Sequence, residues 1–403
     1  MSYNRALSCS IAPALRMLSS SDGMASVKFY PGGEVFSSLA EDFDSKESSI
    51  KESDAELSGI DGFSAENKPI VSTPLLMEPD ANISSEFAAF TVAHGHAPEI
   101  VVVRGLGGFR ISGVGRESLS GVGAVGKSSD RLTGKIAIVT GAAQGFGRGI
   151  AEALAAEGAR IAIADINLEG AMVCAKEINS DYDKGTAIAI GVDVSDESSV
   201  LHMIQETVLT FGGLDIMLSN AGILVAGSLG DLSTESFDLV TKVNYTGYFL
   251  CAKYASEPMK TQSKYAPGYL MDIIEINSKS GLEGSNKNSA YAGSKFGGIG
   301  LTQSFALELA EYGIKVNAIC PGNFLDGSLW SDPDKGLFRQ FLDAGKVDGA
   351  KTVDDVRKFY EAKVPMGRGC TVSDVMRAIL YAVEQKYETG QAIPVTGGQV
   401  MLR

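Results

Sequence analysis

The chain has 403 residues, of which 44% are hydrophobic and 21% are charged, so a substantial hydrophobic core is expected. Its formal net charge of −14 argues against nucleic acids and anionic membrane surfaces as partners, because both require basic patches. No run of about 18 uncharged apolar residues could cross a membrane, and the five scattered cysteines favour a reducing compartment, with the cytoplasm as the expected location.

Residues 1–130 are expected to form an N-terminal extension that is mostly disordered. The first 21 residues are rich in serine and contain two arginines but no acid, which fits either a disordered tail or an organellar transit peptide. Residues 41–61 hold eight acidic and two basic side chains with few large apolar ones, a composition typical of disorder. Residues 98–103 predict one short strand, and the glycine-rich residues 104–115 predict turns.

From residue 131 onward, short apolar runs alternate with helical patterns. Seven such runs occur, at residues 135–140, 160–165, 186–194, 214–220, 271–277, 314–320 and 391–398. Near-continuous apolar strands separated by helices are typical of a parallel sheet that is buried on both faces. The sequence therefore predicts an α/β domain over residues 131–403, with a Rossmann-type, doubly wound, parallel seven-stranded sheet. Its ligand site is expected at the carboxyl ends of the strands.

A glycine motif lies between the first predicted strand and the first predicted helix. Gly141, Gly145 and Gly147 have the spacing G-x-x-x-G-x-G, which permits a tight turn and lets a pyrophosphate approach the helix N-terminus. Asp165 closes the second strand, where a carboxylate can bind the adenosine ribose hydroxyls and repel a 2′-phosphate. This arrangement favours NAD over NADP, although Asp165 could instead cap the next helix.

Four motifs follow one another in a family-specific order. They are Thr140-Gly141-x-x-x-Gly145-x-Gly147, Asp193-Val194, Asn220-Ala221-Gly222 and Tyr291-x-x-x-Lys295. With this order and spacing, residues 131–403 resemble the classical short-chain dehydrogenases/reductases. The resemblance implies a nicotinamide cofactor site formed by Thr140, Gly141, Gln144, Gly145, Phe146, Gly147, Asp165, Asp193, Val194, Asn220, Ala221, Gly222, Tyr291, Lys295, Pro321, Gly322 and Asn323.

Within that family, the C-terminal half is most similar to sorbitol-6-phosphate 2-dehydrogenases and to dehydrogenase domains fused behind class II aldolases. The stretches that carry this similarity include INSKSG, GNFLDG and VPMGRGC. Residues 94–110 are faintly similar to the tail of such an aldolase, as a remnant of it. The resemblance implies NAD-dependent interconversion of a secondary alcohol and a ketone on a sugar phosphate or polyol. Alternatives are another small alcohol, aldehyde or lipid substrate, or a non-catalytic NAD(H)-binding regulator.

The predicted catalytic group combines Tyr291 with Lys295. A free tyrosine has a pKa near 10, but an ammonium four residues away on one helix face can favour the phenolate, which then accepts the hydroxyl proton. The family pattern places the catalytic serine thirteen residues before the tyrosine, at Ser278, with Ser280 as the alternative. The resemblance also implies that Asn244 holds a water of the proton relay, although its amide could simply satisfy backbone groups.

Substrate contacts are expected in the loop between the catalytic serine and tyrosine. Lys279 and Lys287 in this loop could bind a phosphate or polyol hydroxyl beside Ser278 and Tyr291, and both could instead be ordinary surface lysines. Residues 324–370 form a long insertion before the last helix, which is the usual place for a substrate lid.

The sequence departs from the family pattern after Pro321-Gly322. The family usually carries there a threonine that binds the nicotinamide carboxamide, and this chain offers Asn323 or Ser328 instead. Arg368 is expected to serve the structure or to contact an anion.

No metal site is expected. His94 and His96 have the spacing of a metal pair but no evident third ligand. The expected partners are a small-molecule substrate and further copies of the chain. A homodimer or homotetramer that pairs the helices around residues 235–260 and 288–312 is implied by the resemblance.

Overall fold

The computed structural model describes residues 4–19, 25–31, 74–104, 106–112, 131–334, 336–343, 345 and 347–401. The chain divides into two compact units. Unit 1 comprises Met1–Ala124, Gln205–Gly213 and Thr261–Tyr269, and unit 2 comprises Val125–Ile204, Leu214–Lys260 and Leu270–Arg403.

Unit 1 contains a four-stranded sheet of mixed direction. Its elements are α1 (Arg5–Ser19), β1 (Ser26–Pro31), β2 (Leu75–Met77), α3 (Ile83–His94), β3 (Ile100–Val103) and β4 (Gly107–Ser112). The strand order is β1-β4-β3-β2, with β4 antiparallel to both its neighbours and β2 parallel to β3. Phe29 and Phe109, on paired strands, lie 4.9 Å apart between ring centroids, so the sheet buries an aromatic pair.

The structure corrects several predictions for the N-terminal extension. The strand expected at residues 98–103 is confirmed as β3, but the turns expected directly after it are wrong, because Gly107–Ser112 forms β4 and pairs with β3. The first residues form helix α1, which buries Leu15 and Met17, and not a disordered tail. The acidic residues 41–61 lie outside the described residues, and the aldolase-like character of 94–110 stays a prediction.

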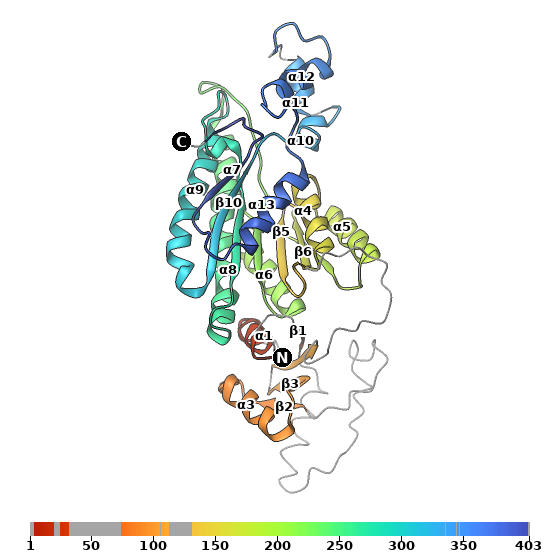
Figure 1. Cartoon of the computed structure of the whole chain (residues 1–403), viewed down its shortest axis with the longest axis vertical. Helices are drawn as coiled ribbons and strands as arrows, with labels where there is room; N and C mark the ends of the chain where they lie inside the picture. Colours follow the sequence, from red (N-terminus) through yellow and green to blue (C-terminus); the bar gives the residue numbers. More distant parts are fainter. Residues whose placement is uncertain are drawn as a thin grey trace. The chain divides into compact units, whose positions relative to one another are not determined.

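Unit 2 is built on the predicted seven-stranded parallel sheet (Figure 1). Its strands are β5 (Ile136–Thr140), β6 (Arg160–Asp165), β7 (Ala187–Gly191), β8 (Ile216–Ser219), β9 (Met271–Ile276), β10 (Ile314–Pro321) and β11 (Ala392–Val395). The order is β11-β10-β9-β8-β5-β6-β7, and every neighbouring pair is parallel. The strand order reverses at β5, so the ligand site is expected at the carboxyl ends of β5 and β8.

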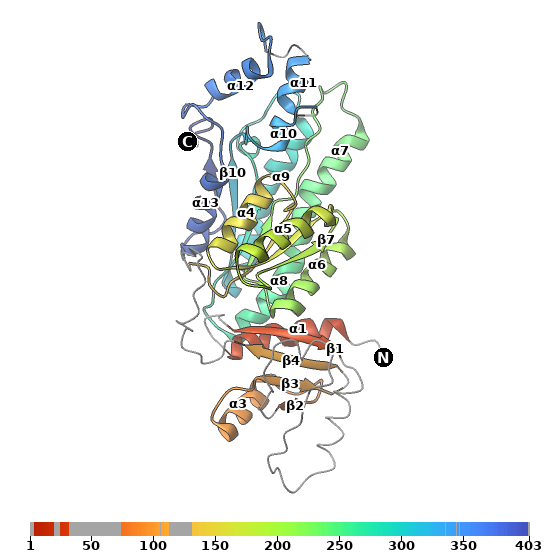
Figure 2. The same ribbon diagram turned by 90° about the vertical axis from the view of Figure 1, so that its right-hand side faces the viewer.

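Helices cover both faces of this sheet. They are α4 (Gly145–Ala156), α5 (Leu168–Asp181), α6 (Glu197–Phe211), α7 (Thr234–Thr241), α8 (Gly247–Tyr265), α9 (Ser289–Leu309), α10 (Ser328–Ser331), α11 (Leu337–Asp343), α12 (Val353–Ala362) and α13 (Val372–Glu384). Figure 2 shows α4, α5 and α13 on one side of the sheet, and α6, α7 and α8 on the other. The predicted doubly wound architecture is therefore confirmed.

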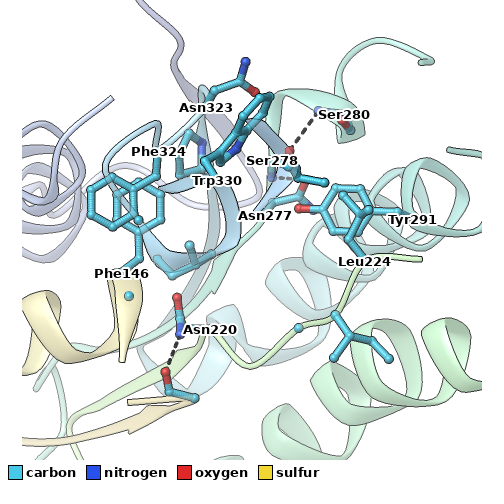
Figure 3. Close-up of a pocket in the computed structure, with 18 of the residues that line it drawn as sticks. Phe146, Asn220, Leu224, Asn277, Ser278, Ser280, Tyr291, Asn323, Phe324 and Trp330 are labelled. Carbon is cyan, nitrogen blue, oxygen red and sulfur yellow. Dashed lines mark hydrogen bonds between the residues drawn. The ribbon is translucent and has the colours of Figure 1, made fainter. Parts of the chain in front are cut away.

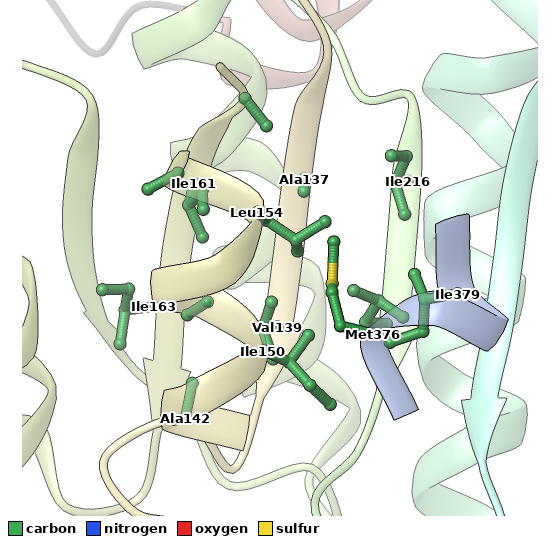
Figure 4. Packing of buried hydrophobic residues seen from close by; sticks show 14 of the residues in the cluster. Ala137, Val139, Ala142, Ile150, Leu154, Ile161, Ile163, Ile216, Met376 and Ile379 are labelled. Atoms are coloured by element: carbon green, nitrogen blue, oxygen red, sulfur yellow. The ribbon is translucent and has the colours of Figure 1, made fainter. Parts of the chain in front are cut away.

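The core of unit 2 fills the space between the sheet and α4, α5 and α13. Ile150 and Leu154 of α4 pack with Val139 of β5 and with Met376 and Ile379 of α13 (Figure 4). These side chains are buried, and each contributes about 1.5–3 kcal/mol when removed from water. The packing fixes the first helix against the first strand, and so fixes the glycine turn between them.

Three short helical turns also shape the site. They are the π-helical turn η1 (Lys242–Thr246) and the 3₁₀ turns η2 (Lys279–Gly281) and η3 (Ala310–Tyr312). The helix expected around residues 235–260 is in fact α7, η1 and α8 in succession, because η1 interrupts the regular helical hydrogen bonding. Such π-helical turns often mark functional sites.

Residues 324–370, here called the lid segment, contain α10, α11 and α12. They enclose a small apolar cluster of their own around Trp330, Phe338 and Val356. Among the helices that the structure describes, none is long and apolar enough to span a membrane.

Candidate functional site

The turn between β5 and α4 forms a cradle of backbone. Gly141 has φ of 65° and Gly145 has φ of 61°, a conformation that favours glycine. A Cβ atom at Gly147 would lie 2.1 Å from the carbonyl oxygen of Gly141, so no side chain fits there. The N-cap residue Gln144 makes no side-chain cap bond, which leaves the first N–H groups of α4 available. The cradle therefore fits the pyrophosphate of a dinucleotide.

Thr140 and Asn220 brace this cradle from beneath. The Thr140 hydroxyl oxygen accepts hydrogen bonds from the backbone N–H groups of Asn220 (3.0 Å) and Ala221 (3.1 Å). The Asn220 side chain donates to the carbonyl oxygens of Thr140 (2.9 Å) and Gly141 (3.2 Å), and it is drawn in Figure 3. These bonds tie the ends of β5 and β8 together. Thr140 is fully buried and does not face the cavity.

Asp165 lies at the carboxyl end of β6 with both carboxylate oxygens held. One oxygen accepts from the N–H of Ala143 (2.9 Å) and the other from the N–H of Asn167 (2.8 Å). The alternative role as a helix cap is wrong, since the N-cap of α5 is Asn167, whose side chain accepts from Gly170. The carboxylate is thus fixed at the edge of the cavity, which it lines.

A cavity of about 730 Å³ runs along the carboxyl ends of the strands. It is lined by every predicted cofactor residue except Thr140, Gly147 and Lys295, and by all four predicted substrate residues. Asp165 ends β6 and Ser278 follows β9, three strand spacings away, which is about 14 Å at about 4.8 Å per strand. One cavity therefore joins the predicted ribose end to the predicted reaction centre.

Ser278 and Tyr291 lie on the same side of this cavity (Figure 3). Ser278 directly follows β9, and its hydroxyl oxygen accepts a hydrogen bond from the N–H of Ser280 (3.1 Å). Tyr291 lies in the first turn of α9, the helix that also carries Lys295. The alternative serine, Ser280, also lines the cavity, but it is buried at 6% exposure, whereas Ser278 is half-buried.

Lys295 is buried and does not line the cavity. Its ammonium donates to the carbonyl oxygen of Ile276 (2.8 Å) and lies 3.5 Å from the carboxylate of Glu275. The other carboxylate oxygen of Glu275 accepts from the side chain of Asn277 (2.7 Å). Burial raises the pKa of Glu275, while the nearby ammonium acts in the opposite direction. Glu275 was missed by the sequence analysis, although an acid within the apolar run MDIIEIN is a signal.

Asn244 lies in the π-helical turn η1 and is almost completely buried. Its side-chain oxygen accepts from the N–H of Ile223 (2.9 Å), and its amide donates to the carbonyl of Ile223 (2.9 Å) and to Ser294 (3.1 Å). Ser294 in turn donates to the carbonyl of Tyr291 (2.8 Å). Asn244 therefore links the loop after β8 to α9, and its relay role stays a prediction.

Comparison with known proteins identifies the family. The model of the short chain dehydrogenase family matches residues 135–332. The chain is 42% identical to a sorbitol-6-phosphate 2-dehydrogenase of Escherichia coli (strain K12), over 66% of this chain and 99% of that protein. The chain belongs to the short-chain dehydrogenase family. It is an oxidoreductase that acts on alcohol groups, and the resemblance drawn from its motifs is confirmed.

Two further relatives of this short-chain dehydrogenase are informative. It is 35% identical to a sorbitol dehydrogenase of Cereibacter sphaeroides, over 67% of this chain and 99% of the relative. The crystal structure of a sorbitol-6-phosphate 2-dehydrogenase from Erwinia amylovora matches with a TM-score of 0.61 at 40% identity, over 66% of this chain and 100% of that one.

The lid segment adds side chains that the sequence analysis did not assign to the site of this short-chain dehydrogenase. Phe324 stacks on Phe146 of the glycine turn, with 4.2 Å between ring centroids and 15° between planes (Figure 3). Trp330, Phe341 and Tyr360 form an aromatic wall, and Lys363 lies beside it. The only tryptophan of the sequence, Trp330, lies within the predicted lid, and this could have indicated its place in the site.

Of the remaining predicted residues, some line the cavity and others make contacts within the protein. Asn323 lines the cavity, whereas the side chain of Ser328 lies outside the described residues. Arg368 makes a bidentate ion pair with Asp374 (2.6 and 2.9 Å), which supports a structural role, and its contact with an anion stays a prediction. In the described part of the chain, no group of three or more potential metal ligands occurs, and His96 instead bonds the carbonyl of Ala97 (2.9 Å).

Proposed function

We propose that the enzyme is an NAD-dependent dehydrogenase that interconverts a secondary alcohol and a ketone on a polyol or sugar phosphate, of the sorbitol 6-phosphate/fructose 6-phosphate type. The observation that carries the proposal is the single cavity shared by Asp165, Ser278 and Tyr291. The names of the two curated relatives described above, which include sorbitol 6-phosphate and sorbitol, support the substrate class.

NAD is proposed as the cofactor on the position of Asp165. Its carboxylate is held by two backbone N–H groups at the end of β6, so it cannot rotate away from a ribose that binds there. A fixed negative charge favours ribose hydroxyls and repels a 2′-phosphate. Asn323 is the proposed contact for the nicotinamide carboxamide, since it lines the cavity after Pro321 and Gly322.

The chain's own residues supply the proton chemistry. When bound, the oxidised nicotinamide supplies the hydride acceptor. The Ser278 hydroxyl hydrogen-bonds the substrate oxygen and holds it beside Tyr291, whose phenolate oxygen accepts the hydroxyl proton as the carbonyl forms. The Lys295 ammonium, on the same face of α9, favours the phenolate. In the reductive direction Tyr291 returns the proton to the carbonyl oxygen.

The experiment is a screen for NAD reduction by purified enzyme over polyols, their phosphates, simple secondary alcohols and lipid alcohols. Turnover with polyols or their phosphates is expected. Turnover with a lipid alcohol alone would contradict the substrate class. Tyr291→Phe is expected to lose about 10²- to 10⁴-fold in kcat while NADH still binds. If the variant replaces the wild-type protein in cells without any change in growth or phenotype, the protein is a non-catalytic regulator.

We also propose a homodimer or homotetramer in the cytoplasm. Phe249 on α8 and Phe296 and Leu307 on α9 are large apolar side chains that remain exposed in the single chain, which supports pairing through these helices. All five cysteines are free thiols, which supports a reducing compartment. Light scattering after size-exclusion chromatography measures the assembly, and a monomer at micromolar concentration would contradict it.

A further inference from the structure

Three lysines line the same cavity as the catalytic serine and tyrosine. Lys279 lies in η2, directly after Ser278, and Lys287 lies in the loop before α9. Lys363 directly follows α12 of the lid segment. Lys287 has φ of 56°, the only positive φ among the non-glycine residues that the structure describes, so this loop holds an unfavourable backbone conformation.

Lys279 is half-buried and makes no ion pair within the described residues. Burial lowers its pKa, the exposed carboxylate of Glu283 acts against this, and the positive charge of Lys363 lowers it further. Within the described residues, no carboxylate lies within ion-pair distance of the Lys279 ammonium, and Glu283 does not line the cavity. The two lysines therefore line one cavity and their ammonium groups repel each other, and an anion between them would relieve this repulsion.

Lys363 differs from the other cations of its helix. Its ammonium lies over the rings of Phe359 (4.2 Å) and Tyr360 (5.1 Å), and no ion pair engages it in the part of the chain that the structure describes. Lys358 on the preceding turn is paired with Asp354 at 2.6 Å. The aromatic contacts hold Lys363 at the cavity wall and leave its hydrogen-bond donors available.

We infer that Lys279 and Lys363 form the subsite for the phosphate group of a phosphorylated polyol, and that the phosphate thereby joins the lid segment to the catalytic loop. The inference rests on the proposed function and specifies its substrate. The subsite serves the substrate and not the cofactor, because Lys279 adjoins Ser278. Asp165, the proposed contact of the cofactor ribose, is about 14 Å away across three strand spacings. A phosphate there can accept charge-assisted hydrogen bonds from both ammonium groups.

The test compares two substrates in one enzyme. For wild type, Lys279→Met and Lys363→Met, kcat/KM is measured with sorbitol 6-phosphate and with sorbitol at fixed ionic strength. Each substitution is expected to lower the ratio of the two values about 10- to 100-fold, because each removes one charge-assisted hydrogen bond to the phosphate. Lys363→Arg is expected to restore most of the ratio. The control Lys358→Met lies on the same helix but outside the cavity, and it should leave the ratio as in wild type.

Failure of the subsite is distinguishable from failure of the proposed function. If sorbitol 6-phosphate is turned over and the double variant Lys279→Met/Lys363→Met keeps the wild-type ratio, the subsite is wrong and the function stands. The subsite is equally wrong if sorbitol is oxidised and its phosphate is not.

A binding measurement decides the case in which neither compound is a substrate. Inorganic phosphate should then raise the Tm of wild type but not of the double variant, relative to chloride at equal ionic strength. The absence of this stabilisation in wild type would overturn the subsite together with the substrate class.

Discussion

The carboxylate of Glu275 lies 3.5 Å from the ammonium of Lys295, with the two side chains only 1% and 5% exposed. Gly298 on α9 makes room for this pair, since a Cβ atom there would lie 2.4 Å from a carboxylate oxygen. Burial raises the pKa of both Tyr248 and Cys320, and the negative charge of Glu275 adds to the rise. The lysine predicted to be catalytic therefore shares its buried site with an acid.

This pair predicts a shifted pH profile for Glu275→Gln. An ionised Glu275 offsets the positive charge of Lys295 that Tyr291 experiences, so removing the carboxylate strengthens the effect of Lys295 on the phenolate. The ascending limb of kcat/KM for alcohol oxidation should move to lower pH, by on the order of one pH unit. A pH–rate series with wild type and variant measures this shift.

Asp272→Asn provides the matched control for this substitution. Asp272 is a second buried acid of β9, paired with Lys315 at 2.8 Å and absent from the cavity lining. Its variant should lose stability without moving the pH profile. A Glu275→Gln profile that superimposes on that of wild type would show that the pair has only a structural role.

Asp165→Asn should reduce the preference for NAD. The neutral amide keeps one acceptor for the backbone N–H groups of Ala143 and Asn167 but removes the charge that repels a 2′-phosphate. We expect kcat/KM with NAD to fall about 10- to 100-fold, which corresponds to about 1.5–3 kcal/mol for hydrogen bonds to a charged group. The value with NADP should fall less or rise.

The control for this experiment is Asp193→Asn. Asp193 also lines the cavity but is exposed after β7, where its carboxylate accepts from the N–H of Ser195 (2.9 Å). It should change the NAD-to-NADP ratio little. An Asp165→Asn enzyme with an unaltered cofactor ratio would contradict the proposed role of the carboxylate.

The sheet of unit 2 was predictable because strands buried on both faces are continuous apolar runs, as in Arg160–Asp165. The site motifs were predictable because their spacing is local, as between Tyr291 and Lys295. The sheet of unit 1 was not, since β1 pairs with β4 about eighty residues later and the paired residues include Gly107 and Gly108. Long-range pairing of glycine-containing strands leaves no periodic pattern.

Contacts between side chains of separate elements were also not predictable from the sequence. Thr140 matches the family spacing, yet it is buried beneath the cradle, which only the pairing of β5 with β8 explains. The stacking of Phe324 on Phe146 joins segments almost 180 residues apart, and no local pattern predicts it.

This stacked pair makes Phe324→Ala informative. The ring contact links the start of the lid segment to the glycine turn, and aromatic pairs contribute about 0.5–1.5 kcal/mol beyond the area that they bury. We expect the KM for the cofactor to rise about 2- to 10-fold and protease cleavage within residues 324–370 to become faster. Phe324→Tyr keeps the ring and should behave as wild type. If Phe324→Ala leaves both the KM and the cleavage rate unchanged, the stack does not hold the lid.

Lys315 forms a buried ion pair with Asp272 at the opposite end of β9 from Glu275. Besides Asp272, the Lys315 ammonium donates to the carbonyl oxygens of Val383 (3.2 Å) and Gln385 (2.9 Å), at the C-terminal end of α13. Lys315→Met removes these bonds and leaves the buried Asp272 without its ion-pair partner, which should lower the free energy of unfolding by about 3–5 kcal/mol. Urea denaturation of the two proteins measures this loss.

The loss should depend on pH with a definite sign. Burial raises the pKa of Asp272 from 3.8 to about 6 even with Lys315 present, so the folded state retains a proton that the unfolded state has released. Ionising Asp272 therefore lowers stability as pH rises through this window. Without Lys315 the penalty grows, and Lys315→Met should lose more stability at pH values above about 6 than near pH 4.

The double variant Asp272→Asn/Lys315→Met carries no buried charge at this position, so it should be more stable than Lys315→Met and lack this pH dependence. Equal stability of the single and double variants across this range would mean that Lys315 acts only through the carbonyl groups of α13.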